Sequence, residues 1–108
     1  MAASASALRA GLIATAALAG LLPAAKADLA LATSKACMAC HMVDRKVIGP
    51  AFKDVAARYK DQKGAADMLA AKILKGGAGA WGPVPMPANT QVSEADAKKL
   101  AAWVLTVK

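Results

Sequence analysis

The feature that most constrains the fold of this chain is the run Cys37-Met38-Ala39-Cys40-His41, which contains both cysteines and the one histidine of the sequence. Two cysteines three positions apart on a helical turn face roughly the same side. Their sulfurs can there form thioether bonds to the two vinyl groups on one edge of a porphyrin, with the imidazole over the iron. The run therefore predicts one covalently attached haem held by Cys37, Cys40 and His41, around which the chain must fold.

Three other uses of a closely spaced cysteine pair compete with this prediction. A structural disulfide and a thioredoxin-like redox pair both leave the histidine unexplained. A thioredoxin-like site also requires strands that alternate with helices, and the sequence shows no such alternation. A zinc site would have Cys, Cys and His but no convincing fourth ligand of the usual kinds. Haem attachment is favoured over all three.

The composition supports a large buried cofactor. The sequence has 108 residues, enough for one domain, and its 57% hydrophobic content is mainly alanine, with one Phe, one Tyr and two Trp. Small domains bury a low fraction of their surface and need a further source of stability. A haem in the core would supply it.

The N-terminal segment is predicted to be a secretory signal. Arg9 precedes an apolar run over residues 11–22, Pro23 follows, and Ala25-Lys26-Ala27 matches an A-x-A cleavage site. The alternative is a membrane anchor, but the apolar run is shorter than the roughly 18 residues that a spanning helix needs. We therefore expect cleavage after Ala27, export to the periplasm, and a domain formed by residues 28–108.

Charge narrows the partners that can be expected. Removal of Arg9 and Lys26 with the signal lowers the formal charge from +7 to +5. This positive charge would either steer the protein toward an acidic partner or simply keep it soluble. Nucleic-acid binding is not expected, because the sequence lacks a clustered basic run with interleaved aromatic residues.

Apolar residues at helical spacing, separated by glycine and proline, predict an all-α fold. The expected helices cover residues 29–41, 51–60, 66–75 and 93 onward. Ser93 followed by acidic residues fits the N-terminus of the last helix. Residues 76–90 contain four glycines and three prolines and are expected to form a long constrained loop, neither helix nor central strand. Loops of this length in compact domains are usually functional.

The sixth iron position cannot be filled by a second histidine of this chain, which leaves a methionine, a lysine or an open site. The methionines after the signal are Met38, Met42, Met68 and Met86. The first two flank the attachment motif, and Met68 is expected to fill the core beside a helix. Met86 lies between Pro85 and Pro87, where a rigid backbone would suit an iron ligand. Met86 is therefore the favoured ligand, and Met/His ligation stabilises ferrous iron.

Several segments together resemble small bacterial class I cytochromes c of the cytochrome c-551 type, over essentially the whole of residues 28–108. They are the attachment motif, Ile48-Gly49-Pro50-Ala51-Phe52-Lys53-Asp54-Val55-Ala56, Trp81-Gly82-Pro83-Val84-Pro85-Met86-Pro87-Ala88-Asn89 and Ala102-Trp103-Val104-Leu105. The resemblance implies about four helices wrapped around one haem. One departure is Ala36, where relatives often have glycine.

The resemblance also implies roles for single residues. The Pro50 carbonyl would accept a hydrogen bond from His41 Nδ1, and Asn89 would bond the region around Met86. Trp81 and Lys72 would lie near a haem propionate, which an indole N–H and an ammonium suit. Each has a plainer alternative: a loop proline for Pro50, a turn residue for Asn89, a core side chain for Trp81 and a solvated surface residue for Lys72.

The function implied is electron transfer in the periplasm, without catalysis. Redox proteins of the cytochrome oxidase, nitrite reductase or quinol-oxidising complex class are the expected partners, and the protein is expected to be a monomer without stable membrane insertion. The competing function is a haem protein with an open or labile sixth site, acting as a gas sensor or a peroxidase. Ligation by Met86 would separate the two.

Overall fold

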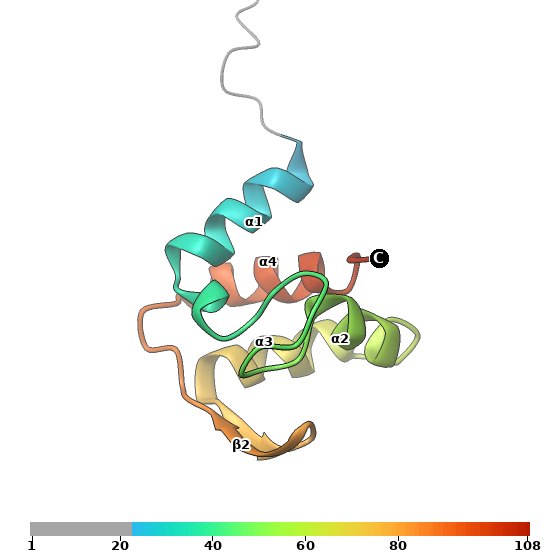
Figure 1. The fold of residues 1–108 in the computed structure, drawn as a ribbon. Coiled ribbons are helices and arrows are strands. Elements are labelled where there is room, and N and C mark those ends of the chain that lie inside the picture. The colour runs from blue at the N-terminus through green and yellow to red at the C-terminus, as the bar shows by residue number, and fades with distance from the viewer. Residues whose placement is uncertain (1–22) are drawn as a thin grey trace, which may run out of the picture.

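In the computed structural model, which describes residues 23–108, four α-helices, one short 3₁₀-helix and a two-stranded hairpin make up the fold (Figure 1). The elements in chain order are α1 (Ala24–Ser34), η1 (Cys37–Ala39), α2 (Phe52–Tyr59), α3 (Ala65–Lys75), β1 (Gly77–Gly79), β2 (Gly82–Met86) and α4 (Glu94–Val104). The expected all-α class is confirmed, since the small sheet is a minor part. No helix within residues 23–108 is long and apolar enough to cross a membrane.

Helix α4 is the element on which the other helices pack. It begins at the expected place, because the Ser93 hydroxyl accepts a hydrogen bond from the Asp96 amide at 3.1 Å and so satisfies one of the free N–H groups of the first turn. The predicted inner face of α4 is buried, including Leu100 and Val104. Helix α3 packs along α4, while α1 and α2 contact it as well (Figure 1).

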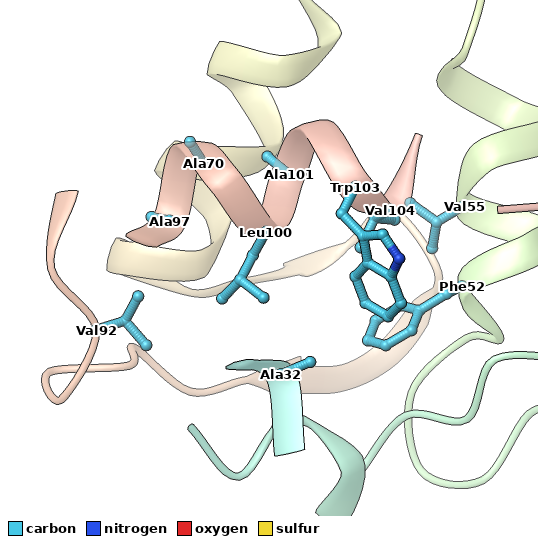
Figure 2. Packing of buried hydrophobic residues seen from close by; sticks show 10 residues of the cluster. All are labelled: Ala32, Phe52, Val55, Ala70, Val92, Ala97, Leu100, Ala101, Trp103 and Val104. Carbon is cyan, nitrogen blue, oxygen red and sulfur yellow. The ribbon is translucent and has the colours of Figure 1, made fainter. Parts of the chain in front are cut away.

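The hydrophobic core is thin, as the composition predicted. Of thirteen buried hydrophobic residues within residues 23–108, seven are alanines, and Leu100 is the one large side chain among them that is fully buried. Phe52 and Trp103 meet edge to face, with ring centroids 5.5 Å apart (Figure 2). Small residues let the helices approach closely, but they contribute little apolar area to the core.

Helix α1 begins earlier than expected. It starts at Ala24 instead of Leu29, because Ala24, Ala25 and Ala27 are strong helix formers and the Pro23 carbonyl accepts the amides of Lys26 and Ala27, both at 3.0 Å. The expected cleavage point after Ala27 therefore lies within α1. The apolar run of the predicted signal, residues 11–22, lies outside the described residues.

The same helix also ends earlier than expected. Our prediction that it continues to His41 is wrong, since α1 stops at Ser34 and the cysteines lie on η1. The break comes at Ala36, whose φ of 63° is left-handed and incompatible with a continuing α-helix. An alanine gives no sequence signal for such a turn. A glycine at this position would adopt it without strain.

The predicted loop over residues 76–90 contains the hairpin. Strands β1 and β2 are antiparallel, with Gly77 opposite Met86 and Gly79 opposite Gly82, and their register is irregular between these pairs. Prolines are tolerated here because both strands are edges, where a missing N–H breaks no ladder. The loop prediction therefore missed a short sheet, which places Met86 at the end of β2.

Candidate functional site

A largely apolar cavity of about 600 Å³ lies among η1, the segment that follows it, α3, the hairpin and α4. This volume is in the range of pockets that hold small molecules and cofactors. The cavity is lined by all eight residues that the sequence singled out, which are Cys37, Cys40, His41, Pro50, Lys72, Trp81, Met86 and Asn89. These eight residues, which are up to 52 positions apart in the chain, therefore meet around one cavity.

The His41 ring is fixed from two directions. Its Nδ1 donates a hydrogen bond to the Pro50 carbonyl oxygen at 2.8 Å, the contact that the resemblance implied. The ring also stacks on Phe52, with centroids 4.8 Å apart and planes 20° from parallel. Since the proton is on Nδ1, the lone pair of Nε2 is free to bind a metal, and the hydrogen bond increases its basicity.

Backbone hydrogen bonds hold the Pro50 carbonyl in place. The Gly49 amide donates to the Cys40 carbonyl at 2.8 Å, and the Phe52 amide donates to the Met42 carbonyl at 2.9 Å. These bonds fold the segment after the motif back on the motif itself. The orientation of His41 is therefore set by the main chain of its own neighbourhood.

Gly49 provides the space for the imidazole. A Cβ at this position would lie 2.6 Å from His41 Cε1 and 2.9 Å from Nδ1, which is too close for any real contact. The backbone at Gly49 is compatible with other residues, because its φ is not in the left-handed range. Glycine is required there by space rather than by backbone conformation.

Gly49→Ala is expected to destabilise the haem-containing protein by about 2–4 kcal/mol, because overpacking costs about 1–3 kcal/mol and a lost hydrogen bond about 1 kcal/mol. Chemical denaturation would measure the loss, and the NMR signal of the His41 Nδ1 proton would report the broken bond to Pro50. Gly64→Ala is the control, since a Cβ there would have no atom within 4 Å and only its φ of +76° is unfavourable. Equal effects of the two substitutions would contradict the steric role of Gly49.

Both cysteines are partly buried and line the cavity. Burial raises the pKa of the Cys37 thiol, and a hydrogen bond to its own backbone offsets this in part. Reactive cysteines of thiol redox proteins have lowered pKa values instead. The environment of Cys37 is therefore unlike that of a thioredoxin-like site.

The methionines differ in their position relative to the cavity. Of the four within residues 23–108, Met68 and Met86 line it, whereas Met38 and Met42 do not. Met68 is half-buried on α3, and Met86 is half-buried at the end of β2. Met68 and Met86 are thus the two methionines whose thioethers lie at the same cavity as His41.

The segment after Met86 is anchored to two other parts of the chain. The Asn89 side chain donates to the Ile73 carbonyl at 2.9 Å and lies 3.5 Å from the Pro87 carbonyl oxygen. Gln91 in turn donates to Asn89 Oδ1 at 3.2 Å and to the Lys35 carbonyl at 3.0 Å. Asn89 therefore bonds the backbone next to Met86. Gln91, which the sequence did not single out, links this segment to the residues just before the motif.

Trp81 and Lys72 lie on the cavity wall, and neither is buried. Trp81 is 41% exposed and packs edge to face on Tyr59, with ring centroids 6.3 Å apart. A second residue that the sequence did not single out, Arg58, stacks on the Trp81 ring with 4.7 Å between its guanidinium carbon and the ring centroid. No local pattern could reveal this contact, because it joins α2 to the hairpin turn.

The donor set and shape of this cavity fit a haem. Cys37 and Cys40 place two thiols beside the imidazole of His41, Met86 offers a thioether, and the walls are mostly apolar. Within the described part of the chain, no group of three or more His, Cys, Asp or Glu side chains could hold a metal ion directly. The imidazole and thioether donors that line the cavity suit a porphyrin iron.

Comparison with known proteins agrees with this geometry. The family model for cytochrome c matches residues 29–108. Cytochrome c-552 of Nitrosomonas europaea is 56% identical over 84 residues, which cover 78% of this chain and 82% of that protein. Cytochrome c-551 of Azotobacter vinelandii is 59% identical over 75 residues, covering 69% of this chain and 90% of that protein.

Solved structures give the same result for the fold. The crystal structure of wild-type Nitrosomonas europaea cytochrome c552 superposes with a TM-score of 0.72 at 55% identity and covers 74% of this chain and 99% of that one. With the family model matching most of the sequence and the cavity built around Cys37, Cys40 and His41, the chain belongs to the cytochrome c family, with a covalently attached haem c as its cofactor.

Proposed function

We propose that His41 and Met86 both bind the haem iron and that this closed centre lets the protein pass single electrons between redox proteins of the periplasm. The observation that carries the proposal is the meeting of the two side chains at one cavity, with His41 Nδ1 bonded to Pro50 and the segment after Met86 anchored through Asn89. These contacts support the proposed ligation, because they hold His41 and the segment after Met86 at the cavity.

The chain is an electron carrier and not an enzyme, in keeping with its family and with relatives named cytochromes c-551 and c-552. The bound haem supplies an iron that alternates between Fe(III) and Fe(II). The Pro50 carbonyl keeps the proton on His41 Nδ1, so that Nε2 stays a ligand. The thioether of Met86, bound to that iron, would favour the ferrous state and leave no room for oxygen or peroxide to bind. Nothing in the comparisons favours the alternative of a gas sensor or a peroxidase.

Polar groups near the cavity are proposed to bind the haem carboxylates. The Trp81 indole N–H and the Lys72 ammonium both suit an anionic oxygen. Lys72 has room to reach the cavity because residue 77 is glycine: a Cβ there would lie 2.7 Å from Lys72 Nζ. The positions of Trp81 and Lys72 on the cavity wall support this binding of the haem carboxylates.

The proposed docking face for partners is the mouth of the cavity. Three residues that line the cavity are also large, apolar and exposed, namely Ile48 at 56%, Trp81 at 41% and Val84 at 61%. An apolar patch near lysines such as Lys46 suits brief contacts with an acidic redox partner. Oxidases, nitrite reductases and quinol-oxidising complexes are the proposed classes, with the protein acting as a monomer.

Export is proposed to precede this function. The family match begins at Leu29, one residue beyond the start of the domain at Asp28, which supports residues 1–27 as a removable signal and residues 28–108 as the domain. The proposed periplasmic location rests on that signal, because a secretory signal directs a protein out of the cytoplasm.

The absorption spectrum of the purified ferric protein tests the proposal. We expect the weak far-red band of sulfur-to-iron charge transfer, and we expect azide and, in the ferrous form, carbon monoxide to bind poorly, because the sixth position is filled. A wild-type protein without this band that binds both ligands readily would contradict the proposal and favour the open-site alternative.

A further inference from the structure

The turn of the hairpin contacts α2 through two neighbouring side chains, Arg58 and Tyr59. The turn residues Ala80 and Trp81 join β1 to β2, and Arg58 on α2 reaches both of them. The Arg58 guanidinium donates to the Ala80 carbonyl at 2.6 Å and stacks over the Trp81 ring at 4.7 Å. We propose that Arg58 is a positioning residue that latches this turn onto α2 and thereby keeps Met86 in place at the haem. The inference rests on the proposed ligation by Met86.

The hairpin is expected to depend on contacts outside itself. It has two strands with an irregular register, its strand residues are exposed except for half-buried Met86, and Gly79 and Gly82 have φ values of +95° and +111°. An isolated two-stranded hairpin is marginally stable at best in water. Its position must therefore come from anchors elsewhere in the fold.

The described contacts place such anchors at both ends of the hairpin. At the base, where Met86 lies, the Asn89 side chain binds the Ile73 carbonyl of α3 at 2.9 Å. At the turn, Arg58 binds the Ala80 carbonyl. Without Arg58 at the turn, the hairpin can pivot about Gly76 and Gly77 at its base, and such a pivot would draw Met86 away from the site that His41 borders.

Arginine is suited to this latch in a way that lysine is not. A guanidinium is planar, so it can stack on an aromatic ring and donate hydrogen bonds at its edge at the same time. Arg58 makes both contacts, and its guanidinium carbon also lies 5.2 Å from the centroid of the Tyr59 ring. A lysine at this position would keep the positive charge but lose the stacking on the ring. Comparing the two residues therefore distinguishes the latch from a simple effect of charge.

The test compares the haem-containing wild type with Arg58→Gln, Arg58→Lys and the control Arg45→Gln. Arg45 is exposed in the segment between the motif and α2, and it makes no side-chain hydrogen bond or salt bridge within residues 23–108. The control therefore removes the same charge without removing a latch. Imidazole is titrated into each ferric protein, and loss of the far-red band reports displacement of Met86.

Arg58→Gln is expected to bind imidazole about tenfold more tightly than wild type, because apparent affinity rises with the fraction of molecules in which the site is open. Arg58→Lys is expected to show a smaller increase of about threefold, as it retains the charge but not the stacking. Arg45→Gln should remain at the wild-type affinity. The near-UV circular dichroism of Trp81 should also weaken in both Arg58 variants, which remain folded by far-UV circular dichroism.

Three results would overturn the latch. One is wild-type imidazole affinity in both Arg58 variants, including the case in which only their global stability falls. Another is an equal increase in Arg58→Gln and Arg45→Gln, which would make the effect one of charge. If Arg58→Gln does not fold, wild-type affinity in Arg58→Lys overturns the latch by itself. A wild type that lacks the far-red band would instead contradict the proposed ligation by Met86, so the two failures are distinguishable.

Discussion

A chain in which Cys37 and Cys40 are both alanine is expected to be largely unfolded and free of haem. Its own core is too small to compensate for an empty site: seven of the thirteen buried hydrophobic residues in the described segment 23–108 are alanines, around a cavity of about 600 Å³. The core of so small a domain supplies roughly 3–5 kcal/mol, and without haem the apolar walls of the cavity face water instead of an apolar partner. Covalent haem binding therefore supplies most of the folding free energy.

Far-UV circular dichroism of the double variant is the measurement, and it should show little of the helix content of the wild type. Cys37→Ala alone is the matched control, because it loses the same thiol but keeps one covalent bond, and it should retain haem and substantial helix. A haem-free double variant with a wild-type spectrum and a cooperative thermal transition would show that the polypeptide folds without its cofactor.

The helices that the sequence predicted well are those with a clear local signal at one end. Helix α2 follows the Gly49-Pro50 break, α3 ends at Gly76, and α4 begins at the Ser93 cap, each within about a residue of the expected position. Their apolar residues recur at helical spacing and are set apart from the polar ones. In these three helices the local sequence signals and the tertiary packing favour the same structure. The helical spacing of apolar residues was therefore sufficient to predict them.

The misjudged elements depend on backbone geometry that their residue types conceal. Ala36 is left-handed although alanine favours helices, so the first helix was extended too far. Its start was placed too late because Ala24–Ala27 were assigned to the signal alone. The hairpin was taken for a loop, since a two-stranded sheet of glycines and prolines lacks the alternation that identifies strands.

The candidate site was predictable to the extent that it is encoded by short runs. Cys37, Cys40 and His41 are a local motif, and the candidacy of Met86 came from elimination and from its flanking prolines. The links made by Arg58 and Gln91 were not predictable, because each joins segments that are distant in the sequence. Such links depend on the finished fold, and both support the hairpin side of the site.

Met86→Ala is expected to abolish the far-red band and to convert the closed centre into an open one. Without the thioether, azide should bind the ferric form and carbon monoxide the ferrous form readily. The reduction potential should fall on the order of 0.1 V, within the roughly 0.8 V range that axial ligands span, because the thioether stabilises ferrous iron. The measurements are absorption titrations and a redox titration of the haem-containing variant.

Met68 provides the matched control, because it is the other methionine within residues 23–108 that lines the cavity. Met68→Leu preserves an apolar side chain of similar volume on α3, so the fold should lose less than about 1.5 kcal/mol and the far-red band should remain. Loss of the band in Met68→Leu and its survival in Met86→Ala would transfer the ligand role to α3. The opposite and expected pattern means that the closed centre depends on a side chain at the end of an exposed two-stranded hairpin, so the contacts that hold this hairpin also govern access to the iron.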